Sequence, residues 1–190
     1  MLSEKLKEQT LVKHQELEKK LVGKMRSMQS VIDYALLLQL FYSYFGGLEN
    51  LINPHISAKT LPDYIERRKA VLLSSDLLIL KAKTPMFASD DHLPNITNTA
   101  EALGALYVME GSTLGGQIIK KMLGKQLGIA ENYATSFFNG YGDDTMKMWA
   151  SFKSALDKLN SPETNEQVIN SANQTFQKFS EWFDIHYKTQ

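Results

Sequence analysis

The feature that most constrains this chain is a cluster of glycines inside a long segment that otherwise favours a helix. Residues 97–127 contain good helix formers and no proline, yet they enclose Gly111, Gly115 and Gly116. Each glycine inside a helix costs about 1 kcal/mol relative to alanine. Such a cluster indicates a bend or the close approach of another group to the backbone, because glycine lacks a side chain. The sequence therefore predicts a kinked helix that faces either a second helix or a flat ligand.

The rest of the chain also shows helical periodicity, with breaks at prolines and glycines. We expect further helices over residues 3–22, 30–52, 62–80, 132–138, 145–159 and 163–187. Ser3 is the predicted N-cap of the first helix, and Asp143 or Asp144 is the predicted cap of the helix that starts at residue 145. No repeat, low-complexity tract or set of alternating strands is present in the sequence. The fold class is therefore predicted to be all-α, with about seven helices in one domain over residues 1–190.

The composition argues against several classes of protein. The 21 basic residues balance the 21 acidic ones, so no overall field attracts nucleic acid or an anionic membrane. The chain has no cysteine, which excludes disulfides, thiolate metal sites and a cysteine nucleophile. Residues 1–8 lack the apolar core of a signal peptide, and no apolar run is long enough to span a bilayer. We expect a soluble cytoplasmic protein with no nucleic-acid or membrane partner.

His14 is the histidine best placed to bind a metal ion. On a helical wheel it lies at the edge of an apolar face, with Lys7 and Glu18 on the same side. Lys7 precedes it by two turns, about 10 Å, which suits a haem held at its centre by imidazole and at its edge by a lysine. Glu18 is placed to accept a hydrogen bond from the second ring nitrogen. The alternative is a histidine that merely borders an amphipathic helix.

Two motifs resemble those of the haem oxygenase family. The first resembles the proximal helix of that family and reads Leu6-Lys7-Glu8-x-Thr10-x-x-x-His14-x-x-x-Glu18. The second resembles the distal helix of bacterial members and reads Tyr107-Val108-Met109-Glu110-Gly111-Ser112-Thr113-Leu114-Gly115-Gly116. Residues 67–77 are also similar to bacterial relatives. The resemblance covers most of the 190 residues, in the order and at the separation that the family shows.

The resemblance implies a haem-oxygenase-like helical bundle that opens haem oxidatively to biliverdin, with release of carbon monoxide and ferrous iron. Haem b would be both substrate and oxygen-activating cofactor, and dioxygen would be consumed. Electrons would come from an external reductant, for which ferredoxin, flavodoxin and a flavin reductase are the candidates. A bacteriophytochrome is a candidate receiver of the biliverdin.

The resemblance also implies residue roles on the haem-binding side. His14 would ligate the iron, and the remaining haem contacts would come from Lys7, Thr10, Glu18 and Lys153. A second basic contact is in doubt because aspartate occupies a family arginine position at residue 157.

The distal segment would supply the catalytic face. Its members are Gly111, Ser112, Gly115 and Gly116, where missing side chains would leave room for dioxygen. Ser112 stands where mammalian-type members carry an aspartate. A hydroxyl can relay a proton but holds no negative charge, so proton delivery is the step that the sequence leaves open.

Two other functions remain open. A haem-binding helical protein without turnover is one, since Ser112 replaces an acid. A di-iron oxidase on a similar scaffold is the other, although such sites usually use Glu-x-x-His pairs and this sequence has none.

Overall fold

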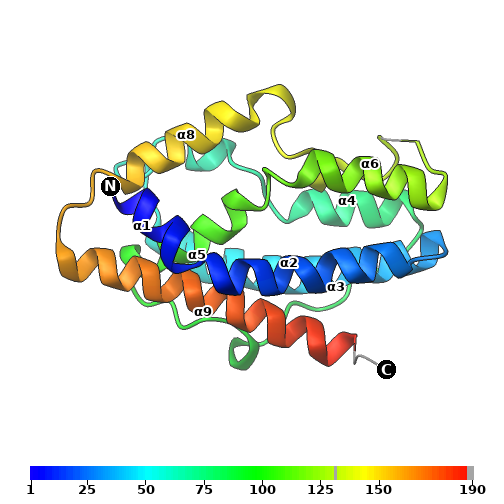
Figure 1. Ribbon diagram of the computed structural model, residues 1–190, viewed down its shortest axis with the longest axis horizontal. Coiled ribbons are helices and arrows are strands. Elements are labelled where there is room, and N and C mark those ends of the chain that lie inside the picture. The colour runs from blue at the N-terminus through cyan, green and yellow to red at the C-terminus, as the bar shows by residue number, and fades with distance from the viewer. Residues whose placement is uncertain (131, 188–190) are drawn as a thin grey trace.

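α3 (Val31–Ile52) runs through the centre of the computed structural model, and α9 (Pro162–His186) lies along one side of it. In Figure 1 they extend along the long axis together with α2 (Leu11–Ser27), which packs against α9. The structure describes residues 1–130 and 132–187, and every regular element in these residues is helical. The predicted all-α class is confirmed.

Shorter helices surround this centre. They are α1 (Leu2–Gln9), α4 (Val71–Ile79), α5 (Thr99–Gly111), α6 (Gly116–Leu127), α7 (Ser136–Asn139) and α8 (Thr145–Leu156). Short 3-10 turns lie at Asn53–His55, Tyr64–Glu66, Asp90–His92 and Gly142–Asp144. α5 packs along α9, and its far end leads toward α8 and α6 (Figure 1).

α3 is a long apolar helix that is mostly buried. Its start is fixed by a reciprocal cap, in which the Ser30 hydroxyl accepts from the Asp33 amide and the Asp33 carboxylate accepts from the Ser30 amide. The window Val31–His55 is long and apolar enough to cross a membrane, but 67% of it is buried inside the fold. Its burial makes it a core helix. Tyr44 stacks on Phe179 of α9 at a centroid distance of 4.6 Å, so the aromatic residues of these two helices form the core.

The N-terminal segment differs from the prediction at two points. The helix predicted over residues 3–22 is divided at Thr10 into α1 and α2, and the hydroxyl of Thr10 donates to the carbonyl of Leu6. Such side-chain bonds compete with the helical ladder. Ser3 is not the N-cap, because α1 begins at Leu2. The amide and hydroxyl of Ser3 instead donate to the two carboxylate oxygens of Asp157, each at 2.8 Å, and tie α1 to the end of α8.

The helix predicted over residues 62–80 is also wrong in its first half. Only the turn Tyr64–Glu66 and α4 are helical there. Arg67 adopts extended backbone (φ −74°, ψ 149°), and its guanidinium is held by two carboxylates outside α4. The helix predicted over residues 132–138 is limited to α7. Tertiary contacts override local helix propensity in both segments.

The glycine-bearing segment forms two helices where the sequence predicted one kinked helix. α5 ends at Gly111 and α6 begins at Gly116, and residues 112–115, here called the distal turn, join them. The hydroxyls of Ser112 and Thr113 donate to the carbonyls of Met109 and Glu110, each at 2.7 Å. These bonds occupy carbonyls that the next helical turn would otherwise use, so the helix stops.

Gly116 is required by packing. A Cβ atom at this position would overlap the backbone carbonyl of Phe138 in α7. At Gly115, by contrast, a Cβ atom would meet nothing within 4 Å, and the backbone φ of −83° is allowed to any residue. Neighbouring glycines therefore serve different purposes, and only Gly116 lets α6 approach α7.

We expect Gly116→Ala to destabilise the protein by about 1–3 kcal/mol, since the added carbon must displace backbone. The matched variant Gly115→Ala should leave stability unchanged or raise it by about 0.4–1 kcal/mol, because alanine restricts the unfolded chain. Urea unfolding followed by circular dichroism measures both. Equal midpoints for the two variants would contradict the packing role of Gly116.

Candidate active site

His14 projects from α2 as a half-exposed side chain. Its imidazole Nε2 lies 3.2 Å from a carboxylate oxygen of Glu18, and its ring lies 5.3 Å from that of Phe176 in α9. The side chain is 48% exposed, so a ligand can reach it. The contact with Glu18 occupies one ring nitrogen and orients the ring. No other polar contact of the imidazole occurs among the described residues, which leaves the second nitrogen for a metal ion.

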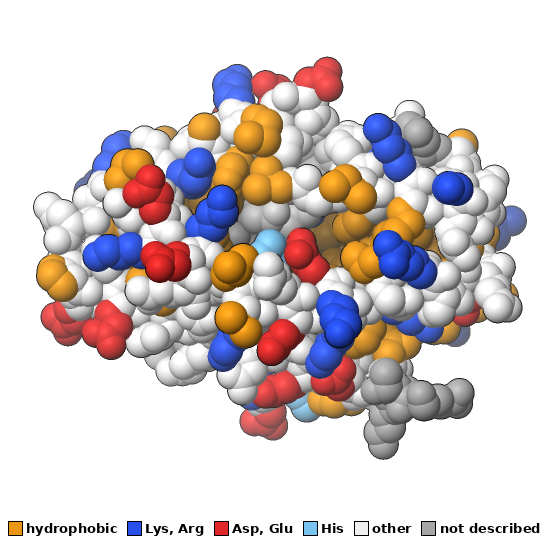
Figure 2. All heavy atoms as spheres, in the orientation of Figure 1, with side chains coloured by type: hydrophobic (Ala, Val, Ile, Leu, Met, Phe, Trp, Pro, Cys, Tyr) orange, Lys and Arg blue, Asp and Glu red, His pale blue; other side chains and the backbone are white. Residues whose placement is uncertain are grey.

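The face that carries α2 and α6 is hollowed near its centre, and hydrophobic side chains line the hollow (Figure 2). The two helices approach one another at the end where Gln126 of α6 donates to the Met28 carbonyl at 3.0 Å. Basic side chains border the same face in Figure 2. An apolar hollow with a charged border suits a flat, mostly apolar ligand that carries peripheral acids.

Two of the three predicted glycines at or beside the distal turn have open space around them. A Cβ atom at Gly111 would meet only the Trp149 ring, at 3.9 Å, and one at Gly115 would meet nothing within 4 Å. Gly116 differs because a Cβ atom there would meet α7, so this glycine has a packing role.

Ser112 is held on the inner side of the distal turn. Its hydroxyl donates to the Met109 carbonyl at 2.7 Å and accepts from the guanidinium of Arg68 at 2.6 Å. The hydroxyl proton is therefore already used inside the protein. The structure thus places the Ser112 hydroxyl in two internal hydrogen bonds.

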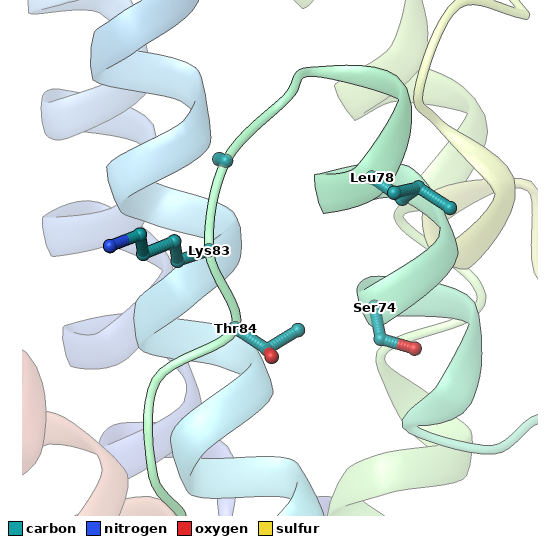
Figure 3. A pocket seen from close by; sticks show the side chains of 5 residues that line it. Ser74, Leu78, Lys83 and Thr84 are labelled. Atoms are coloured by element: carbon teal, nitrogen blue, oxygen red, sulfur yellow. The ribbon is translucent and has the colours of Figure 1, made fainter.

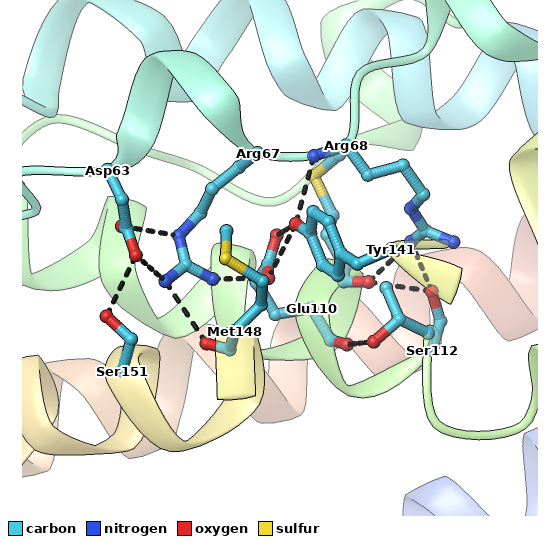
Figure 4. Close-up of polar contacts among 10 residues, drawn as sticks. Asp63, Arg67, Arg68, Glu110, Ser112, Tyr141, Met148 and Ser151 are labelled. Carbon is cyan, nitrogen blue, oxygen red and sulfur yellow. Dashed lines mark hydrogen bonds and ion pairs between the residues drawn. The ribbon is translucent and has the colours of Figure 1, made fainter. Parts of the chain in front are cut away.

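A buried ionic network lies beneath the end of α5 (Figure 4). Arg67 donates to Glu110 at 2.5 Å and to both carboxylate oxygens of Asp63 at 2.9 Å. Tyr141 donates its hydroxyl proton to Glu110 at 2.9 Å and accepts from the backbone amide of Arg68. Burial lowers the pKa of Arg67, but the carboxylates of Glu110 and Asp63 outweigh it and raise the pKa above its ordinary value. Burial, followed by the charge of Glu110, raises the pKa of Tyr141.

The predicted haem-edge residues take different places. Lys7 is exposed on α1 and Lys153 is half-buried on α8, and neither ammonium group has a polar partner among the described residues. Thr10 is buried, and its hydroxyl donates to the Leu6 carbonyl at 2.7 Å. Asp157 stands at a family arginine position, and its carboxylate accepts hydrogen bonds from the amide and the hydroxyl of Ser3.

The sequence did not point to the roles of Arg67, Arg68 and Tyr141. Two consecutive arginines in a charged stretch were the available signal. Asp63 lies only four residues before Arg67, but the other side-chain partners are distant: 43 residues separate Arg67 from Glu110, and 44 separate Arg68 from Ser112. Nothing local in the sequence indicates such contacts.

The groove beside α4 and the side chain of His186 are poorer candidates for binding a metal ion or haem. An open groove beside α4, lined by Ser74, Leu78, Ala82, Lys83 and Thr84, contains no histidine or carboxylate (Figure 3). The ring of His186 bonds the Trp182 carbonyl through Nδ1 and packs on the Trp182 ring. Within residues 1–130 and 132–187, no group of three or more histidine, aspartate or glutamate side chains is placed to hold a metal ion. The described part of the chain therefore provides no donor set for a di-iron centre.

Comparison with known proteins decides the family. The family model for heme oxygenase matches residues 1–185. A heme oxygenase of Xanthomonas campestris pv. campestris (strain 8004) is 30% identical over 148 residues, which cover 77% of this chain and 86% of the relative.

The chain belongs to the haem oxygenase family.

Solved structures agree with this assignment at the level of the fold. The heme oxygenase of Neisseria meningitidis, solved with NO and CO bound, superposes with a TM-score of 0.82 at 20% identity, covering 100% of this chain and 94% of that one. The heme oxygenase of Leptospira interrogans superposes with a TM-score of 0.77 at 21% identity, covering 97% and 98%.

Membership in the haem oxygenase family makes this protein an enzyme that binds haem as its substrate and uses oxygen to degrade it. The donor set fits that group. An oriented imidazole with one nitrogen to spare suits iron, the hollow suits a macrocycle, and unpartnered lysines suit carboxylates at its edge.

Arg67→Met should destabilise this haem oxygenase by about 3–5 kcal/mol, because it leaves the carboxylate of Glu110 buried without its cation. The double variant Arg67→Met/Glu110→Gln should recover most of that loss, since no unpaired charge remains at position 110 and the new amide oxygen can still accept from Tyr141. Chemical denaturation of both variants checks this. A double variant as unstable as the single one would show that the pair itself contributes the stability.

Proposed function

We propose that this enzyme opens the haem macrocycle oxidatively to biliverdin and releases carbon monoxide and ferrous iron. The observation that carries the proposal is the half-exposed imidazole of His14, which is oriented by Glu18 and whose second ring nitrogen makes no polar contact among the described residues. The apolar hollow on the face of α2 and α6 and the space at Gly111 and Gly115 support the proposal. When bound, haem supplies the iron that binds and activates dioxygen.

The residues of the site would have three roles: they bind the iron, orient the macrocycle and leave room for a small ligand. His14 would hold the iron, and Glu18 would keep the ring tautomer that leaves the ligating nitrogen free. Lys7 and Lys153 would attract the two propionates, which orients the macrocycle in its plane. Gly111 and Gly115 would leave room on the opposite face for a small ligand, while the backbone of the distal turn borders it.

The partners follow from the chemistry. Opening the ring consumes electrons that the protein does not store, so an external reductant is required, with ferredoxin, flavodoxin and a flavin reductase as candidates. A bacteriophytochrome is a candidate receiver of biliverdin, and we place the reaction in the cytoplasm.

The deciding experiment is an absorption spectrum of the protein reconstituted with haemin, followed after addition of ascorbate or reduced ferredoxin in air. We expect the Soret band to decay while a broad red biliverdin band grows. His14→Ala should abolish the specific Soret shift, because it removes the iron ligand. A stable Soret band in the unmodified protein would favour the haem-binding function without turnover, and no specific Soret shift would remove His14 as ligand.

Glu18→Ala should weaken haem binding by about tenfold or more, because loss of a group that orients a metal-bound histidine typically has that effect on affinity. The matched control is Glu16→Ala, which removes an exposed carboxylate from the same helix without contacting His14. Haemin titration followed at the Soret maximum gives both dissociation constants. Equal values for the two variants would contradict the orienting role of Glu18.

A further inference from the structure

Arg68 is a buried arginine whose guanidinium has no carboxylate in hydrogen-bond contact among the described residues. The residue is 7% exposed, and the guanidinium donates to Met109 O at 2.6 Å, to Ser112 Oγ at 2.6 Å and to Phe137 O at 3.3 Å. Its central carbon lies 3.9 Å from the centroid of the Phe137 ring. Burial lowers the pKa of Arg68 to about 10, against the opposing charge of Glu110, so the group remains charged at neutral pH. Burying a charge that is bonded only to neutral groups costs free energy, so these bonds must contribute something to the fold.

The acceptors of Arg68 lie on both sides of the helix break. The Met109 carbonyl belongs to the last turn of α5, where carbonyls lack helical partners and the helix dipole favours a cation. Ser112 is the first residue of the distal turn. One planar guanidinium therefore joins the end of α5 to the distal turn that follows it, as Figure 4 shows.

The third acceptor connects the same guanidinium to α7. The Phe137 carbonyl accepts from Arg68, while the amides of Ser136 and Phe137 donate to the buried carboxylate of Asp76 at 2.9 and 3.0 Å. The next carbonyl, that of Phe138, lies against Gly116 at the start of α6. α7 thus supports both ends of the distal turn, through Arg68 on one side and Gly116 on the other.

The bonds of Ser112 follow from this support. A hydroxyl has one proton to donate, and that proton goes to Met109. One lone pair accepts from Arg68. Turning the hydroxyl proton toward a ligand in the hollow would break the bond to Met109, and moving the oxygen would also break the bond from Arg68.

We propose that Arg68 is a positioning residue that holds the distal turn against α7, with the Ser112 hydroxyl as an internal tie and not as a proton donor to a haem ligand. The proposal rests on the proposed function, because it concerns the face opposite the iron ligand. The distal turn then presents backbone and the open space at Gly115 to that face, and its position depends on contacts made behind it.

The test uses the ferric haem complex of the full chain and two probes that bind iron opposite His14. Imidazole is neutral and bulky, so its affinity reports how firmly the distal turn restricts space. Azide is an anion that accepts hydrogen bonds, so its affinity reports charge and donors. Arg68→Met and Arg68→Lys both remove the planar fork, and the lysine variant keeps the positive charge.

We expect imidazole to bind about fivefold more tightly or better in both Arg68 variants, while haemin affinity stays within about twofold of wild type. Ser112→Ala should change azide affinity by less than about twofold, because its hydroxyl does not serve the ligand. The matched control is Arg67→Met/Glu110→Gln, which removes a neighbouring buried guanidinium that does not contact the distal turn, and it should leave imidazole affinity unchanged.

Three results would overturn the proposal. Unchanged imidazole affinity in Arg68→Lys would show that the fork does not hold the distal turn. A change in azide affinity alone, restored by lysine, would show an effect of charge. A loss of azide affinity of about tenfold in Ser112→Ala would show that the hydroxyl serves the ligand. Ser112→Ala removes no buried charge, so it decides this last point even where the Arg68 variants fail to fold.

Failure of the proposed function gives a different result. If the unmodified protein shows no specific Soret shift with haemin, there is no complex to titrate and the haem assignment itself falls. If the complex forms and the probes do not respond to Arg68, only the positioning role falls.

Discussion

The structure depends on the ion pairs and hydrogen bonds that two consecutive arginines, Arg67 and Arg68, make at the end of α5. Arg67 has extended backbone, and neighbouring side chains on extended backbone point to opposite sides. Arg67 therefore reaches Glu110 and Asp63, while Arg68 reaches Met109 and Ser112. One short segment before α4 thus fixes α5 and the turn that follows it. Because both guanidinium groups are buried, any displacement of α5 would separate a buried positive charge from its hydrogen-bond partners.

The two sides of the hollow are built differently. On the proximal side, His14 is half-exposed and bonded only to Glu18 among the described residues, one turn along the same helix. Around the distal turn, Arg68 joins Ser112 to α7 by hydrogen bonds between segments that are far apart in sequence. Under the proposed function, the bond between His14 and the iron would orient the haem from one side. No such bond would act from the other side, so the geometry there would be set by contacts within the protein.

The sequence predicted what depends on local pattern. The helix expected over residues 30–52 is observed as Val31–Ile52 with Ser30 as its cap, and the spacing of four residues between His14 and Glu18 brings them together. The sequence did not predict what depends on distant contacts. The break at Thr10, the bond from Ser3 to Asp157 and the partners of Arg68 arise from residues brought together only by folding. Helix propensity carries no information about such contacts, which is why residues 62–80 and 97–127 were each predicted as one helix.

The glycine cluster shows why a binding face and its support require different residues. Under the proposed function, a face that admits a planar ligand cannot be filled from the ligand's side, and Gly111 and Gly115, where a Cβ atom would meet little or nothing, would leave that side open. An unfilled turn gains little packing energy there, so its order has to come from the side away from the ligand. Gly116 permits close contact with Phe138, and Arg68 bonds the turn and α7 together. Open space on the proposed ligand side and polar bonds on the α7 side belong to one arrangement. Gly111 and Gly115 would provide the open space, and Gly116 permits the close contact with α7.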